Sequence, residues 1–226
     1  AGKKVLMDVS NGWYIVSFFL GGGGSLSIGA DGKQVCDFNN YPGVGESMKN
    51  ITASNAFLTG DDTVIVGGMG DTIAAAVSGT WNATAIQEKL GDNYAATKLP
   101  TFDVDGTPTQ MSSFAGFKLI GVNSLSAFPA EAMDLADWLS NEENQLKRFY
   151  ARQIGPSNLN AAANPDVLAN VALSALAEQG EFAKSQNDVL GNFWTPAEAF
   201  GQAMENKDYS KSVQELLDDM VAQIQA

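Results

Sequence analysis

Short apolar runs alternate with helical stretches along most of this chain, and that alternation limits the folds open to it. Residues 4–8 (KVLMD) form one such run, and the helical stretch GWYIVSFFL follows almost directly. The runs at 72–78 and 118–124 are likewise followed by helical stretches. Strands that alternate with helices are typical of α/β proteins, in which helices cover a sheet. We therefore predict the α/β class.

Residues that favour helix starts mark several of the predicted helices. Ser10 and Asn11 are possible caps for GWYIVSFFL, and Asn82 can cap ATAIQEKL, because each offers a side-chain oxygen to free backbone N–H groups. Pro129 suits the first position of a helix whose apolar face adjoins Trp138, which we expect in the core. In TPAE, Thr195 is expected to cap the next helix, so that Trp194 lies just before it.

Other predicted elements complete the pattern. They are a hairpin at 25–39, a strand-like run at 94–102 leading into a DVDG turn, and helices at 45–57, 142–152, 166–179, 196–205 and 213–224. The run GGGGS at 21–25 is a common engineered linker. Its flanks continue one pattern, which favours a natural glycine-rich helix end, with the linker as the alternative.

The charge of the chain excludes some partners. Asp plus Glu number 26 against 13 for Lys plus Arg, which gives a net charge of -13. Nucleic acid and anionic membrane surfaces would repel such a chain, and no basic run offsets the excess. The sequence contains no histidine and one cysteine, Cys36, which we expect to be a buried, inert thiol in a strand. We therefore predict no metal site, no cofactor and no internal disulfide.

No apolar stretch approaches the roughly 18 residues that a membrane span requires. The first residues, AGKKVLMDVS, do not have the pattern of a signal peptide and resemble a helix end followed by a buried strand. We expect the chain to be part of a longer protein.

Three of the four tryptophans stand where strands give way to helices. Trp13 lies in a first helical turn with Tyr14 beside it, Trp81 precedes Asn82, and Trp194 precedes Thr195. In an α/β sheet the carboxyl ends of the strands face the ligand crevice. These rings can therefore lie at a binding edge, although ordinary packing at the rim of the core explains them as well.

Flat aromatic faces suit the apolar faces of sugar rings, whose hydroxyl groups need polar partners nearby. Asn11, Asn82, Asn192 and Asp8 are close in sequence to the tryptophans and can fill that role.

Other motifs do not indicate a catalytic, calcium-binding or phosphate-binding site. The acidic pairs at 61–62, 142–143 and 218–219 are neighbours in sequence and do not face each other, so we interpret them as solvated acids. The segment DVDG begins like a calcium loop but lacks the later glutamate, so we expect a hairpin turn. GGMGDT lacks the lysine of a phosphate-binding loop. We predict no catalytic residue.

The order of several motifs resembles a known family. The chain contains IAAAVSGTWNA, then FAGFKLIGVNS, then GPSN, and finally NFWTPAEAFGQAM with a terminal helix. This order is similar to that of the extracellular solute-binding proteins of sugar ABC transporters, in the maltose and maltodextrin group. The resemblance spans essentially the whole chain.

The resemblance implies that Trp81 and Trp194 stack on sugar rings. It also implies a third aromatic contact from Tyr14, which Trp13 beside it can enlarge. The family usually has Gly-Pro-Trp where this chain has Gly79-Thr80-Trp81, which leaves the identity of the sugar open.

The family fold has two α/β lobes with the ligand in the cleft between them, and closure is a hinge motion. By this resemblance, residues 1–112 and 166–226 form most of the C-terminal lobe. Residues 113–165 are a hinge strand and helices of the N-terminal lobe. The implied partners are an oligosaccharide and the permease subunits of the transporter. The implied location is extracellular or periplasmic, with any lipid anchor in the part of the protein that this chain lacks.

Two other functions stay open on the sequence. A glycoside-active enzyme would need two carboxylates near the aromatic cleft, and Asp8 and Glu198 are the only candidates close in sequence to the tryptophans. A binding protein of the same fold could instead take another oligosaccharide, a peptide or another solute.

Overall fold

The computed structural model describes residues 2–226 and centres on a small parallel sheet. Strand β1 (Lys4–Leu6) lies between β4 (Phe57–Leu58) and β5 (Ile73–Ala76). Both neighbours run parallel to β1. Parallel neighbours require crossover connections, and helices supply them here. The predicted α/β class is confirmed.

One face of this sheet is covered by α3 (Asp62–Gly68) and α4 (Ala83–Leu90). Leu6 from β1 and Ile73 from β5 meet Ile65 and Ile86 from the two helices in one buried cluster. The cluster holds α3 and α4 against the sheet, so the ends of β4 and β5 stay beside the end of β1.

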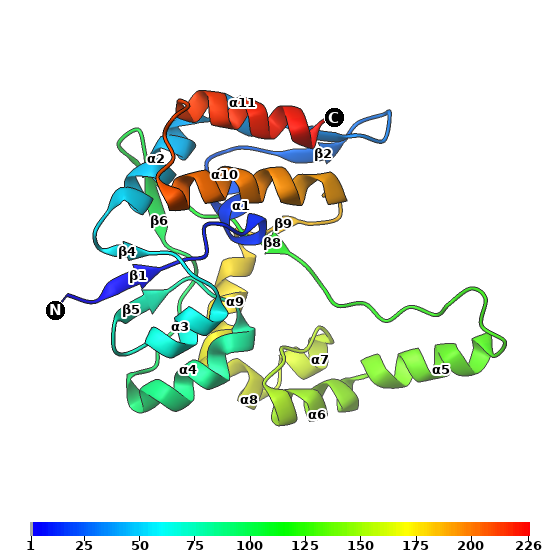
Figure 1. Cartoon of the computed structure of the whole chain (residues 1–226). Coiled ribbons are helices and arrows are strands. Elements are labelled where there is room, and N and C mark those ends of the chain that lie inside the picture. The colour runs from blue at the N-terminus through cyan, green and yellow to red at the C-terminus, as the bar shows by residue number, and fades with distance from the viewer. Residues whose placement is uncertain (1) are drawn as a thin grey trace.

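The main core lies on the other side of β1. It is built by α1 (Gly12–Gly21), α2 (Pro42–Ala53), α10 (Trp194–Asn206) and α11 (Val213–Ile224), which lie close together in Figure 1. Eight of the ten residues of α1 are buried, so apolar side chains surround this helix. Its Phe19 ring stacks on Phe38 with centroids 4.7 Å apart.

The glycine run at the end of α1 is part of this packing. A Cβ atom at Gly21 would lie 2.4 Å from the backbone oxygen of Gln110, and one at Gly22 would lie 2.3 Å from Val44. Gly23 has a φ of +100°, which side chains rarely adopt. These contacts support the natural helix end over the linker.

Two hairpins flank the core. β2 (Leu26–Ile28) pairs with β3 (Gln34–Cys36), which confirms the predicted hairpin. Cys36 is buried, as expected, and burial raises the pKa of its thiol to about 12. β6 (Thr101–Val104) pairs with β7 (Thr107–Gln110) across the DVDG turn, as predicted. The predicted strand at 94–102 is present only in its last two residues.

Four predicted boundaries were wrong for local reasons. The expected helix at 45–57 ends at Ala53, because Phe57 pairs with β1 instead. Thr195 does not cap α10, because the short 3₁₀ helix η4 (Gly191–Phe193) runs directly into it and α10 begins at Trp194. Asn82 ends another 3₁₀ helix, η2 (Thr80–Asn82), and its side chain does not cap α4. The helix expected at 166–179 is interrupted, because Asn170 caps a new helix.

A long arm leaves the body after β8 (Phe114–Ala115), which pairs with β9 (Lys184–Ser185). Residues 116–128 form neither helix nor strand and lead to α5 (Pro129–Ser140), far from the sheet in Figure 1. The strand predicted at 118–124 was wrong, since no neighbouring strand pairs with it. Leu119 and Leu125 are 88% and 90% exposed.

The chain returns through α6 (Glu142–Arg152), α7 (Leu159–Ala162), α8 (Pro165–Leu168) and α9 (Val171–Gly180). Phe149, Val167 and Leu173 form a small cluster of their own there. Trp138 on α5 is 55% exposed, so its predicted place in the core was wrong. The described residues place no apolar surface over it.

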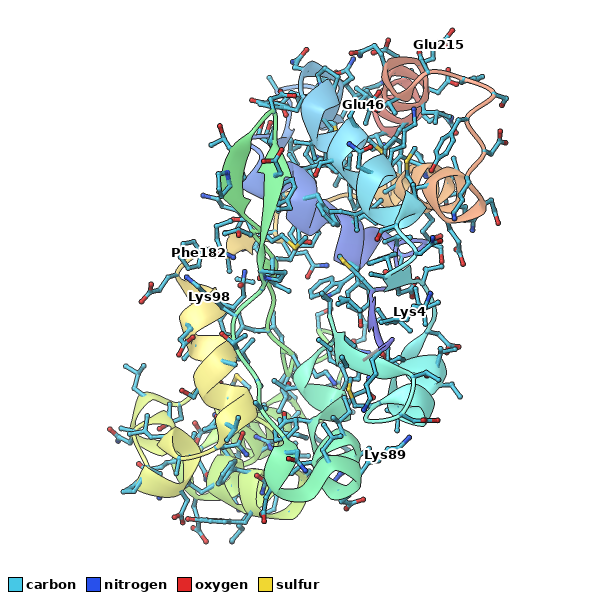
Figure 2. All side chains as sticks on the ribbon, turned by 90° about the vertical axis from the view of Figure 1, so that its left-hand side faces the viewer. Lys4, Glu46, Lys89, Lys98, Phe182 and Glu215 are labelled. Carbon is cyan, nitrogen blue, oxygen red and sulfur yellow. The ribbon has the colours of Figure 1, made fainter. Side chains whose placement is uncertain are left out.

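The end of α9 is tied back to the chain before β6. Gln179 accepts a hydrogen bond from the backbone N–H of Leu99 at 2.9 Å. The Lys98 ammonium lies 4.2 Å from the centroid of the Phe182 ring, and Figure 2 shows the two residues side by side.

Among residues 2–226, no helix has both the length and the apolar character to cross a membrane.

Substitution by alanine is expected to have opposite effects on stability at two helical glycines. A Cβ atom at Gly201 in α10 would lie 1.9 Å from the backbone oxygen of Val9, so Gly201→Ala forces α10 away from the turn after β1. We expect it to lower the free energy of unfolding by roughly 1–3 kcal/mol. A Cβ at Gly67 in α3 would meet nothing within 4 Å. Gly67→Ala should therefore raise that free energy by about 0.5–1 kcal/mol.

Chemical denaturation of both variants measures these changes. Equal effects of the two substitutions would contradict the close approach of α10 to Val9.

Candidate functional site

A cavity of about 430 Å³ opens where the three parallel strands end. It is lined by residues that follow each strand in turn: Asp8, Asn11, Trp13 and Tyr14 after β1, Asp61, Asp62 and Thr63 after β4, and Trp81 after β5. The carboxyl edge of a parallel sheet is where α/β proteins bind ligands. The lining combines three aromatic rings with carboxylate, amide and hydroxyl groups.

The turn between β1 and α1 positions the first group of side chains. The side-chain oxygen of Asn11 accepts a hydrogen bond from the backbone N–H of Trp13 at 2.9 Å, which confirms Asn11 as the cap of α1. The cap fixes Trp13 and Tyr14 in the first helical turn. The hydroxyl of Ser10 donates to Asp8 at 3.0 Å and orients that carboxylate.

Tyr14 carries a polar group that the described residues leave unpaired. Tyr14 is only 9% exposed, and within residues 2–226 its hydroxyl makes no hydrogen bond of regular geometry, although the side chains of Ser78 and Asp62 are close enough to influence its pKa. Burial raises the pKa of Tyr14 to about 12, and the negative charges of Asp62 and Asp8 add to the shift. The hydroxyl therefore stays protonated at neutral pH and is available to a ligand. A buried polar group without a partner is costly, which a ligand hydroxyl would relieve.

The second group comes from the start of α3. Asp61 caps this helix by accepting hydrogen bonds from the backbone N–H groups of Thr63 and Val64, at 3.0 and 3.1 Å. Asp62 is partly buried and accepts from the indole N–H of Trp81 at 2.8 Å and from the amide of Asn82 at 2.7 Å. The prediction that this pair is solvated acid was therefore wrong for Asp62.

Asn82 and Trp194 lie outside the cavity lining. The Asn82 amide is engaged by Asp62 and by the hydroxyl of Ser78 at 2.9 Å. Trp194 is partly buried against Phe193 and Phe114, with ring centroids 5.0 and 6.2 Å away.

Phe114 also lies 5.6 Å from Trp13, so the rings of Trp13, Phe114 and Trp194 form a continuous aromatic row. The structure thus brings Asn11, Trp13, Tyr14 and Trp81 together around one cavity and places Trp194 at the far end of this row.

Asp61, Asp62 and Thr63 are the cavity residues that the sequence-based prediction missed. The reason is that Phe57 and Leu58 were assigned to a helix or left without structure, so the third strand of the sheet went unseen. An Asp-Asp-Thr segment after a strand would have indicated a helix start at the ligand edge. Asn192, another predicted polar partner, donates instead to the backbone oxygen of Ile224 and holds the end of α11.

Within residues 2–226, no cluster of three or more histidine, cysteine, aspartate or glutamate side chains is arranged to hold a metal ion. The two carboxylates considered for a glycosidase do not share the site, since Asp8 lines the cavity and Glu198 does not.

Comparison with known proteins identifies the family. Residues 1–175 match the model of a bacterial extracellular solute-binding protein. The chain belongs to this family. Its members are substrate-binding proteins, and the periplasmic-binding-protein-like α/β fold expected from the sequence is confirmed.

Individual relatives point to sugars. A solved structure with acarbose has a TM-score of 0.86 and 27% identity to this chain over 99% of it. A maltodextrin-binding protein from L. casei BL23, solved without ligand, has a TM-score of 0.79 at 21% identity over the same share. A galactooligosaccharide-binding protein of Bacillus subtilis (strain 168) is 33% identical over 128 residues, 56% of this chain.

The chain spans 62% of the length of each of the two solved relatives and 30% of the Bacillus subtilis protein.

The raised pKa of Tyr14 gives a pH-dependent prediction. In the unfolded chain the phenol loses its proton near pH 10, whereas the folded protein keeps it to about pH 12. Between these values the unfolded state binds fewer protons, so stability falls as pH rises. We expect the phenolate absorbance of wild type minus Tyr14→Phe to appear near pH 12 in the folded protein.

The same difference measured in denaturant should appear near pH 10, which serves as the control. A folded-state difference already complete near pH 10 would contradict the burial of this hydroxyl beside two carboxylates.

Proposed function

We propose that this chain is the ligand-binding part of a carbohydrate receptor that serves an ABC importer. The ligand is a maltose- or malto-oligosaccharide-like sugar, held by aromatic stacking and by hydrogen bonds to its hydroxyl groups. Trp13, Tyr14 and Trp81 supply the rings, and Asn11 supplies the amide that lines the cavity. Asn82 donates to Asp62, the carboxylate that also accepts from Trp81. Trp194 contacts the sugar farther along the aromatic row.

The lining of the cavity is the observation that carries this proposal. Two indole rings offer flat apolar surface, while the carboxylates of Asp8 and Asp61, one amide and two hydroxyls offer acceptors and donors. Sugar rings need this combination, because their faces are apolar and their edges carry hydroxyl groups. Within residues 2–226, no lysine or arginine lines the cavity, so an anionic ligand would be repelled by this wall.

The identity of the sugar separates two candidates. The solved relative with acarbose covers nearly the whole chain and favours a gluco-oligosaccharide. The galactooligosaccharide-binding relative is more similar in sequence but covers only 56% of the chain, which makes a non-glucan oligosaccharide the alternative. A solute other than a sugar would make less use of the exposed ring of Trp81.

The arm after β8 supports a two-lobe arrangement. We propose that residues 1–112 and 166–226 form one lobe and that residues 113–165 belong to a second lobe. The arm carries large apolar side chains that are more than half exposed: Phe117, Leu119, Leu125, Phe128, Met133, Leu135 and Trp138. Single exposed apolar residues are common, but a concentration of them marks a surface that packs against more protein.

Membership of the family supports the proposed role in an importer. Extracellular solute-binding proteins deliver ligands to membrane permeases, so we propose an extracellular or periplasmic location and permease subunits as partners.

Tryptophan substitutions test the proposal. We titrate the wild-type chain with a malto-oligosaccharide series and a galacto-oligosaccharide series and follow tryptophan fluorescence. Trp81→Ala and Trp194→Ala should each raise the dissociation constant about tenfold or more, as truncation of a central aromatic contact does. Trp138→Ala is the matched control, since this ring lies on the distant α5. It should leave affinity unchanged.

A chain that presents one wall of a cleft binds weakly, so the titration is repeated on a protein that includes both lobes. Saturable binding that all three substitutions leave unaltered would overturn the placement of the sugar. Tighter binding of the galacto-oligosaccharides would support the alternative ligand.

A further inference from the structure

Trp81 combines high exposure with a fixed position. Its side chain is 58% exposed, yet its indole N–H donates to the Oδ2 atom of Asp62 at 2.8 Å. The six-membered ring also fills the space beside Gly79. A Cβ atom at Gly79 would lie 2.0 Å from Cζ3 of Trp81 and 2.2 Å from Cε3 and Cη2. The ring therefore packs on bare backbone, and only glycine leaves room for it.

Asp62 accepts a second hydrogen bond besides the one from the indole. Its Oδ1 atom accepts from the amide of Asn82 at 2.7 Å, and the same amide donates to the hydroxyl of Ser78 at 2.9 Å. Ser78 lies just after β5, whereas Asp62 lies in the first turn of α3. The Asp62 carboxylate thus links the segment after β4 to the segment after β5 by accepting hydrogen bonds from both Trp81 and Asn82.

We infer that Asp62 and Gly79 are positioning residues that hold the Trp81 ring in its ligand-binding orientation before a sugar arrives. This inference rests on the proposed function. An exposed tryptophan without such contacts samples several rotamers and must lose that freedom when a ligand binds. A ring held by a hydrogen bond at its edge and by backbone at its side has already lost it. Asp62 therefore contributes to affinity through Trp81.

Substitutions at the two residues separate positioning from direct contact. Gly79→Ala removes no group that a sugar could bind and displaces the ring. Asp62→Leu removes both hydrogen bonds, and Asp62→Asn keeps one side-chain oxygen as an acceptor. We expect Gly79→Ala and Asp62→Leu to raise the dissociation constant for maltotriose roughly three- to tenfold, and Asp62→Asn to raise it less. Gly67→Ala and Asp92→Leu, both outside the cavity, are the matched controls.

A double-mutant cycle gives the decisive result. Combined with Trp81→Ala, Asp62→Leu should cause little further loss of affinity, because the ring through which it acts is gone. Fully additive losses would overturn the inference and assign Asp62 a direct contact with the sugar. The same test applies to Gly79→Ala. If it reduces affinity as much in the Trp81→Ala background as in the wild type, the inference is overturned.

A measurement without sugar tests the same inference independently. The indole N–H resonance of Trp81 in the proton–nitrogen spectrum should shift in Asp62→Leu and in Gly79→Ala, and should stay in place in the two controls. An unchanged resonance in both variants would contradict the positioning role. If Trp81→Ala alone leaves sugar affinity unchanged, the proposed function fails, whereas the resonance shift still decides whether Asp62 and Gly79 fix the ring.

Discussion

The short turn between β1 and α1 is the constraint on which the rest of the site depends. Residues 7–11 carry the chain from the centre of a parallel sheet into a helix buried on nearly every side. Met7 and Val9 are buried, and α10 lies so close to Val9 that only glycine fits at position 201. Asp8 lies between these two buried residues and faces the cavity, while Asn11 reaches the cavity edge as the cap of α1.

The same geometry explains why three separate segments meet. Parallel strands bring their carboxyl ends to one edge, so each of the connections after β1, β4 and β5 contributes to a single lining. The cavity is acidic and aromatic, in keeping with a net charge of -13. Side-chain hydrogen bonds hold the cavity residues in place. Asn11 caps α1, Asp61 caps α3, and Asp62 accepts from both Trp81 and Asn82.

Much of this arrangement could be predicted from local sequence signals. The Asn11 cap, the hairpins and the tryptophans after strands are each set by neighbouring residues, and they predict Asn11, Trp13, Tyr14 and Trp81 at one edge of the sheet. Asp62 could not be found in this way, because its role depends on residues 19 and 20 positions later in the chain. The strand at 118–124 and the burial of Trp138 failed for a related reason. Both need a packing partner that the described residues do not include.

The central claim is that the rings around the cavity, and not the exposed ring on α5, meet the sugar. The most direct measurement is a proton–nitrogen spectrum of the four indole N–H groups during titration with maltotriose. We expect the resonances of Trp81 and Trp13 to move in a saturable way and the resonance of Trp138 to stay in place. Saturable binding with the Trp81 and Trp13 resonances unmoved would show that the ligand occupies another part of the protein and not this cavity.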